Sequence, residues 1–100
     1  MLIIKEPALR RLFFVAGGLF HKIKSCDKDA NNVTNPGTYF VNLYTGKTTN
    51  YPSVKDIIIL EVFIFTSSTN IYIVQRATCF NGSIYSRSKT NTANWTTWVK

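Results

Sequence analysis

The dipeptide Asn81-Gly82 lies between two segments in which apolar and polar side chains alternate, and this arrangement constrains the fold more than any other feature. The flanking segments, 70–80 and 83–89, show the two-residue repeat that is typical of β-strands. Asn and Gly both tolerate the positive φ angles of tight turns, so the sequence predicts an antiparallel hairpin at this point.

The length of this turn decides which side chains face each other across the hairpin. A strict two-residue turn would set Arg76 opposite Arg87. A loop that is one residue longer, or a bulge, would set Gln75 opposite Arg87 instead, because register follows loop length. The sequence leaves both pairings open.

Three further strands are expected in the remainder of 29–100. Segment 38–44 alternates and has one firmly apolar side. Segment 56–65 is apolar almost throughout, with Glu61 as its one charge, and fits a central strand buried on both faces or a core helix. Its isoleucine-rich composition favours the strand, with Glu61 facing solvent or paired to a basic residue on a neighbouring strand. Segment 95–100 is expected to be the last strand.

These elements predict a mostly β protein whose core domain, 29–100, is a small antiparallel sheet built from hairpins in a meander. The connections leave no room for a crossover helix, so parallel pairing is not expected. Asp29 and Asn31 fit a turn that leads into the first strand, and Pro36-Gly37 marks the corner before it.

Residues 1–28 form a basic, apolar arm with a different rhythm. Pro7 suits the first turn of a helix, and apolar residues recur on one helical face, although Gly17-Gly18 weaken it. The arm is therefore a helix or two short strands broken at the glycines. An apolar stripe is stable only when other residues bury it. We therefore expect the arm to serve docking or oligomerisation, with its stripe packed on the domain that follows or on identical chains. The stripe comprises Leu9, Leu12, Phe13, Ala16, Leu19, Phe20 and Ile23.

The composition bounds the function. The net charge of +7 favours anionic partners, but the basic residues are scattered and form no run. No apolar stretch approaches the roughly 18 residues of a membrane-spanning helix. Cys26 and Cys79 have no metal-ligand spacing and are expected to be free thiols rather than a disulfide, and His21 is the only histidine. The sequence thus predicts no enzyme, no metal site and no cofactor.

Both tryptophans of the chain, Trp95 and Trp98, lie in its last six residues. Residues three apart on a strand point to opposite faces, so one indole is expected in the core and the other on the outer face near Arg87 or Tyr85. An exposed indole beside polar groups is typical of sugar-binding surfaces. The alternative is a structural cation–π pair with Arg87 or a subunit interface. The candidate ligand-binding residues are Gln75, Tyr85, Arg87, Trp95 and Trp98.

Several of these residues recur in an order that resembles the knob-like module of bacteriophage and pyocin tail fibres. The resemblance covers 29–100 and runs through Asp29, Asn31, Pro36-Gly37, Tyr39, Val41, Gln75, Gly82, Ile84, Tyr85, Arg87, Trp95 and Trp98. It implies a virion tail-fibre component, made in the host cytoplasm, that works as a homotrimer with other virion proteins and attaches to a bacterial surface polysaccharide. The arm matches no fibre shaft, which leaves a stand-alone virion component open.

Two other functions are kept as alternatives. One is a structural virion or adaptor protein that binds no ligand of its own. The other is a basic β-domain that binds nucleic acid, although the aromatic residues are not interleaved with Lys and Arg on one strand face. Affinity for a nucleic acid, which depends on phosphate contacts, would fall steeply as the salt concentration rises. Affinity for a neutral sugar that stacks on an indole would barely change.

Overall fold

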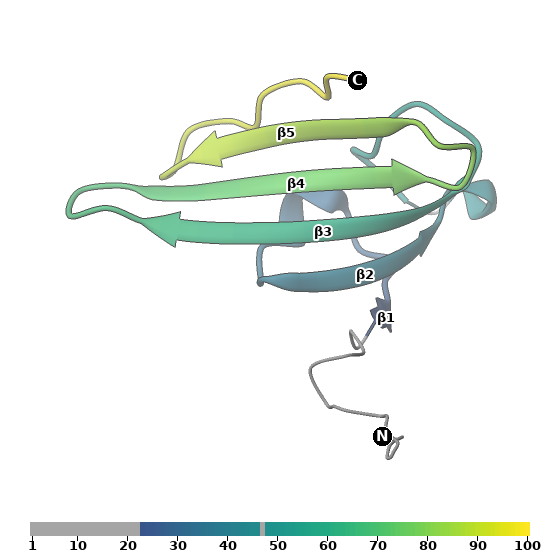
Figure 1. Cartoon of the computed structure of the whole chain (residues 1–100), viewed down its shortest axis with the longest axis horizontal. Helices are drawn as coiled ribbons and strands as arrows, with labels where there is room; N and C mark the ends of the chain where they lie inside the picture. The colour runs from purple at the N-terminus through teal and green to yellow at the C-terminus, as the bar shows by residue number, and fades with distance from the viewer. Residues whose placement is uncertain (1–22, 47) are drawn as a thin grey trace, which may run out of the picture.

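The computed structural model describes residues 23–46 and 48–100, which form one five-stranded sheet with the strand order β1-β2-β3-β4-β5 (Figure 1). The strands are β1 (Ile23–Ser25), β2 (Gly37–Asn42), β3 (Ile57–Thr66), β4 (Ile71–Cys79) and β5 (Ile84–Thr90). Two short 3-10 helices, η1 (Ala30–Asn32) and η2 (Leu43–Thr45), flank β2. The predicted mostly β class and the central meander β2–β3–β4–β5 are confirmed.

The sheet is mixed, because β1 pairs with β2 in parallel while the other three pairings are antiparallel. The expectation of a purely antiparallel sheet was therefore wrong. The chain returns from β1 to β2 through residues 26–36, which contain η1 and cross one face of the sheet. A crossover loop that contains a single helical turn is thus long enough to connect the three-residue strand β1 to β2 in parallel. β1 lies within the stretch that the sequence assigns to the arm.

The hairpin between β4 and β5 has the longer of the two predicted loops. Cys79 N–H donates to the Ser83 carbonyl at 2.8 Å, and Gly82 N–H donates back to the Cys79 carbonyl at 2.9 Å. Gly82 has φ 98°, which its lack of a side chain permits. This three-residue loop sets Gln75 opposite Arg87, so the second of the two alternative registers is the real one.

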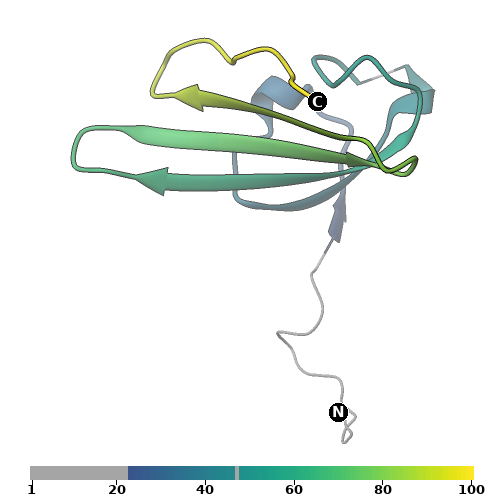
Figure 2. The same cartoon turned by 45° about the horizontal axis from the view of Figure 1, so that its top comes forward.

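The C-terminal segment, residues 91–100, is not the predicted strand. It runs along the free edge of β5 and meets it through one isolated bridge between Ser86 and Val99. Further along, Thr96 N–H donates to the Ser88 carbonyl, but Ser88 N–H donates to the Thr96 side-chain hydroxyl rather than to a backbone carbonyl. A side-chain acceptor therefore interrupts the backbone ladder. Figure 2 shows this segment curving over the edge of the sheet.

One side of the sheet, here called the core face, is covered by residues 26–35, residues 43–46 and 48–56, and the C-terminal segment (Figures 1 and 2). Alternate residues of β3, Ile58 and Leu60, are fully buried there. The covering loops contribute Ala30, Val33, Leu43 and Tyr51 to the same core. Strand register places Tyr39, Val41, Ile58, Leu60, Val62, Ile73, Gln75, Ala77, Tyr85 and Arg87 on this face.

The opposite side, here called the outer face, carries no second layer among the described residues. The prediction that β3 is buried on both faces was wrong, since Phe63 and Phe65 are 46% and 58% exposed. Glu61 pairs there with Arg76, as the sequence suggested. The same register places Ile23, Phe40, Ile59, Glu61, Phe63, Phe65, Tyr72, Val74, Arg76 and Ile84 on the outer face.

The prediction of a helix or two short strands in the arm falls on residues 1–22, outside the described residues. The same holds for His21 and for most of the apolar stripe, which remain sequence predictions.

Candidate functional site

Four of the five candidate residues meet on the core face near the C-terminus. Gln75 and Arg87 are directly opposed on β4 and β5. Trp95 and Trp98 reach them from the C-terminal segment, and both lie over Arg87. The fifth candidate, Tyr85, shares this face but packs against the hydrophobic core instead of joining the cluster.

Arg87 lies between the two indoles. Its guanidinium carbon is 4.3 Å from the ring centroid of Trp95 and 4.6 Å from that of Trp98. A planar, weakly hydrated guanidinium stacks well on aromatic faces, and desolvation strengthens the attraction. The residue is only 7% exposed, so the C-terminal segment is held on the sheet by a buried cation between two rings.

The expectation that the two tryptophans face opposite sides of a strand was wrong. Residues 94–98 are not extended β-structure, so the alternation of strand side chains does not apply to them. Both rings turn toward the core face and contact the same side chain. The structural cation–π pairing that the sequence left as an alternative is what the geometry shows.

Gln75 is completely buried, and its hydrogen bonds are internal. Its amide nitrogen donates to the carbonyls of Ala30 and Val33 at 2.7 and 2.9 Å. Its amide oxygen accepts from Arg87 Nε at 2.8 Å. Gln75 therefore joins the η1 loop, the sheet and the buried cation, and has no donor left for a ligand.

A second chain of hydrogen bonds fixes the loops around this cluster. Asp29 caps η1 by accepting from Asn31 N–H at 2.8 Å, and both of its oxygens accept from the side-chain amide of Asn50. The backbone carbonyl of Asn50 accepts from Trp98 Nε1 at 2.9 Å. The sequence pattern predicts a turn at Asp29 and Asn31 but does not indicate Asn50. Asn50 has a left-handed backbone with φ 62°, a conformation in which Asn is enriched. A single Asn in a loop is nevertheless too common to predict such a contact from the sequence.

These contacts leave a hollow of about 610 Å³ between the C-terminal segment and the loops on the core face. Its walls combine the two half-buried indoles with amide and hydroxyl groups. Its lining includes the side chains of Asn31, Asn50, Lys89, Asn94, Trp95 and Trp98. Such a mixture of aromatic surface with hydrogen-bonding groups suits a polar ligand that also has C–H faces.

The charges at the hollow are unequal. Burial lowers the pKa of Arg87 to about 10, although the nearby Asp29 carboxylate opposes that shift. The hydrogen bonds from Asn50 and from the Asn31 backbone lower the pKa of Asp29 below its usual value of 3.8. Lys89 Nζ lies 5.8 Å from the Trp95 ring, also on the wall of the hollow. The site therefore carries two cations near one carboxylate.

Other candidate chemistry is sparse in 23–46 and 48–100. Cys26 and Cys79 are free thiols there. Cys26 Sγ lies 4.0 Å from the hydroxyl of Tyr51, which itself donates to the Lys28 carbonyl, and burial raises the pKa of that phenol. In the same ranges, no group of three or more His, Cys, Asp or Glu side chains is placed to hold a metal ion.

No helix among the described residues is long and apolar enough to span a membrane. Comparisons of the chain with protein-family models, with curated proteins and with solved structures found no match.

Proposed function

We propose that this protein is a saccharide-binding attachment module of a phage-fibre type, with the hollow at Trp95 and Trp98 as its binding surface. The observation that carries the proposal is the composition of that hollow. Two indoles lie beside several side-chain amides and hydroxyls in about 610 Å³, which is the size of a small-ligand site. The described site offers no catalytic constellation, so we expect binding without chemistry.

The contacts suit sugars for a specific reason. A pyranose ring presents C–H groups on its faces and hydroxyls around its edge, so it needs an apolar surface bordered by donors and acceptors. Asn94 is exposed and offers both a side-chain donor and an acceptor beside the indoles, whereas the Asn50 amide nitrogen already donates to Asp29. Arg87 fixes the rings in place before any ligand arrives, which lowers the entropy lost on binding.

The biological setting follows from the resemblance to tail-fibre knobs and is part of the proposal. The chain would be assembled in the host cytoplasm into a virion tail or fibre, with other virion proteins as partners and a bacterial surface glycan as receptor. The resemblance implies a homotrimer, whereas the uncovered outer face of the sheet favours pairing of two copies, and the mass of the protein in solution decides between them.

The test is binding of the 100-residue chain to bacterial surface polysaccharide, measured by calorimetry or on a glycan array. Asn94→Ala and Thr97→Ala remove exposed polar groups at the hollow, and each should weaken binding roughly tenfold, about 1.4 kcal/mol. Thr69→Ala, an exposed threonine in the distant turn between β3 and β4, is the matched control. Binding that these hollow variants leave unchanged would exclude this site.

Substitution of a tryptophan is a harsher test, because each indole also stabilises the fold. Trp98→Ala removes one side of the Arg87 stack and the bond to the Asn50 carbonyl. Its melting temperature has to be measured beside its affinity. Trp98→Phe keeps a ring over Arg87 while losing the N–H donor, so it separates stacking from hydrogen bonding.

A second candidate function is a structural virion or adaptor protein without a ligand, and one observation favours it. Gln75 and Arg87, which the sequence placed at the ligand, are buried and bonded to the protein itself. If this candidate is right, the hollow variants should leave both glycan binding and cell adsorption per particle unchanged. Nucleic-acid binding has weaker support, since Arg87 and Lys89 are the only cations among the described residues that line the hollow. A steep loss of affinity with salt would identify it.

A further inference from the structure

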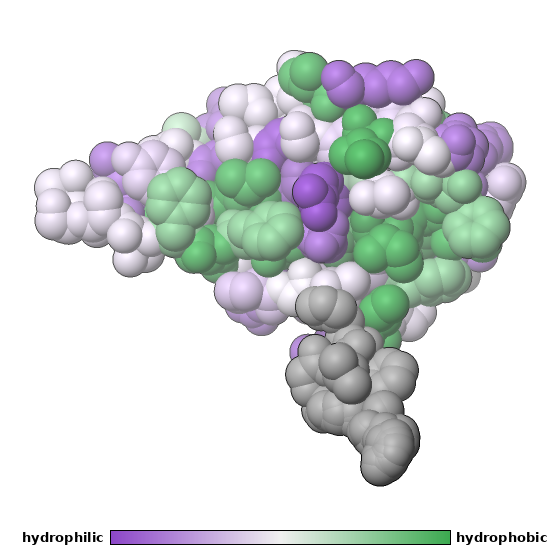
Figure 3. All heavy atoms as spheres, viewed as in Figure 1, coloured by the Kyte–Doolittle hydropathy of each residue, from purple (hydrophilic) through white to green (hydrophobic). Residues whose placement is uncertain are grey.

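The outer face exposes several large apolar side chains. Phe40, Phe63 and Phe65 are 37%, 46% and 58% exposed, and Ile23 and Ile84 are each about half exposed. The three phenylalanines alone present on the order of 300 Å² to solvent. Patches of this extent are the largest that typical monomers expose, and they are often functional. Figure 3 shows hydrophobic residues on both sides of a hydrophilic centre.

The hydrophilic centre is the ion pair between Glu61 and Arg76, whose closest atoms are 2.7 Å apart. The two residues are directly opposed on β3 and β4, so the negative charge belongs to one central strand and the positive charge to the next. Arg76 keeps 48% of its side chain exposed and also lies over the Phe63 ring. Its guanidinium therefore still has solvent-facing donors.

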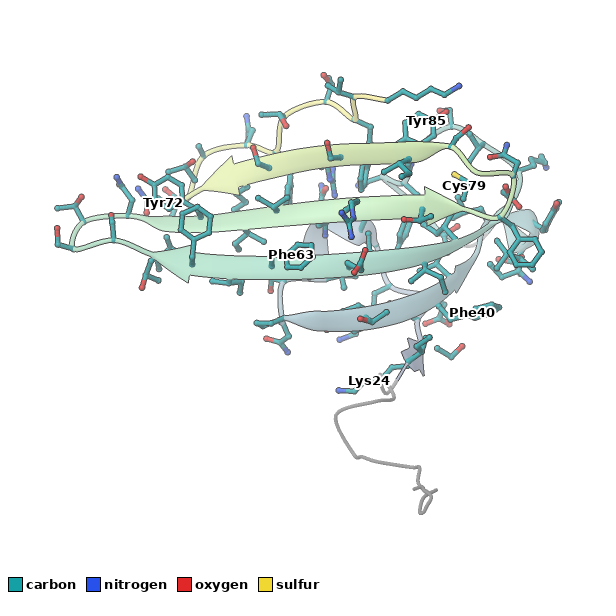
Figure 4. All side chains as sticks on the ribbon, viewed as in Figure 1. Lys24, Phe40, Phe63, Tyr72, Cys79 and Tyr85 are labelled. Carbon is teal, nitrogen blue, oxygen red and sulfur yellow. The ribbon has the colours of Figure 1, made fainter. Side chains whose placement is uncertain are left out.

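The aromatic residues on either side of this pair follow the same arrangement. Phe63 is opposed to Val74, and Phe65 to Tyr72, with which it stacks at 4.8 Å between ring centroids. On the outer face, β3 thus carries the acidic residue and the phenylalanines, while β4 carries the basic residue and their partners. Figure 4 shows Phe63 and Tyr72 lying over these strands on the uncovered side.

We propose that the outer face binds the same face of a second copy of this chain, in a two-fold sandwich whose axis runs along β3 and β4. Such an axis places β3 of one copy over β4 of the other. The Glu61 carboxylate then faces the Arg76 guanidinium of the second copy, and Phe63 faces the second copy's smaller Val74. The patch is self-complementary, as an isologous interface requires. An axis across the strands would set each charge against its like.

The dimensions suit this packing. Sheets in sandwiches lie about 10 Å apart, a distance that facing aromatic and long charged side chains fill. A standard interface buries about 800 Å² per partner. The phenylalanines supply on the order of 300 Å² of this area. The aliphatic residues of β1 and β5, with Tyr72 and Arg76, extend the patch to the width of the sheet.

The test uses the 100-residue chain and two complementary charge reversals. The wild-type protein should show a concentration-dependent mass that reaches twice the chain mass of 11.4 kDa in sedimentation or light scattering. Arg76→Glu places two acids at the centre of each copy, and Glu61→Arg places two bases there. Each variant alone should dimerise at least tenfold more weakly than the wild type. An equimolar mixture should restore the dimer, because every acid then faces a base.

Controls keep the result interpretable. Lys28→Glu changes an exposed charge in the loop that covers the core face, and it should leave the mass unchanged. Phe63→Ser should weaken pairing without altering charge, and circular dichroism checks that each variant is folded. A wild-type monomer at all concentrations would overturn the proposal, because another part of the chain or a different protein would then cover the face. A trimer or a dimer whose mass does not change on either charge reversal would also overturn the proposal. So would an equimolar mixture of the two variants that stays monomeric.

Discussion

Arg87 and Arg76 lie on neighbouring strands and point to opposite faces of the same sheet, yet they are stabilised in different ways. Arg87 on the core face is 7% exposed and is held by two indoles and an amide oxygen. Arg76 on the outer face is half exposed and makes a two-donor contact with a carboxylate. No ion pair to Arg87 is present in the described part of the chain, although Asp29 influences its pKa.

The difference shows that the contribution of an arginine to stability depends on which face of the sheet it occupies. An exposed ion pair contributes about 0–1 kcal/mol, because water screens it and both side chains lose freedom. A buried cation is costly unless its donors and its flat faces are satisfied, and removing one of its partners costs several kcal/mol. The core-face cluster should therefore dominate stability, while the outer-face pair should mainly direct association.

The largest expected effect comes from Gln75→Leu. This change removes the shared partner of the Ala30 carbonyl, the Val33 carbonyl and the Arg87 Nε. We expect a loss of about 4 kcal/mol in the free energy of unfolding, measured by urea denaturation. Thr69→Ala, in the exposed turn between β3 and β4, should change it by less than about 0.5 kcal/mol. A Gln75→Leu protein as stable as the control would contradict the role assigned to the cluster.

The next effect compares the two arginines directly. Arg87→Lys keeps the charge but loses the planar stack and the Nε bond, so we expect a loss of about 2–3 kcal/mol. Arg76→Lys should cost about 0.5 kcal/mol or less. Thermal unfolding of both variants under identical conditions measures the contrast. Equal losses would mean that the two faces do not differ in this way.

The smallest effect is the pH dependence contributed by Asp29. Hydrogen bonds lower its pKa in the folded state, so its contribution is complete above pH 3.8 and disappears as pH falls through the lower folded pKa. Asp29→Asn should lose about 1 kcal/mol at neutral pH and show a shallower loss of stability in acid. Asp27→Asn controls for removal of one loop carboxylate, and urea denaturation from about pH 6 to about pH 2.5 measures both. Identical acid slopes would contradict the role of Asp29.

The local elements could be predicted from the sequence, because they depend on side-chain periodicity and turn chemistry. β2, β3, β4 and β5 lie close to the segments where alternation or apolar runs placed them. The Asn81-Gly82 hairpin was found, but its loop length was left open, since two- and three-residue loops suit the same dipeptide. Asp29 was placed in a turn for the same local reason, which is that its side chain bonds its own backbone.

The candidate site was predicted in part. The sequence grouped Gln75, Arg87 and the two tryptophans, and the structure brings all four together. It assigned them to a ligand, whereas Gln75 and Arg87 bond mainly within the protein. Asn50 was missed because its partners, Asp29 and Trp98, lie 21 and 48 residues away. No local pattern reports contacts of that range.

The sequence by itself determined β2, β3, β4 and β5 and the presence of the hairpin between β4 and β5, because periodicity and turn preference act between near neighbours. Only the tertiary structure decided that β1 pairs in parallel, that residues 95–98 leave β-structure and wrap both indoles around one cation, and that β3 buries a single face. Each of these outcomes depends on which loops reach which face of the sheet. That choice is made by long-range packing and hydrogen bonding, which a repeat of two residues does not encode.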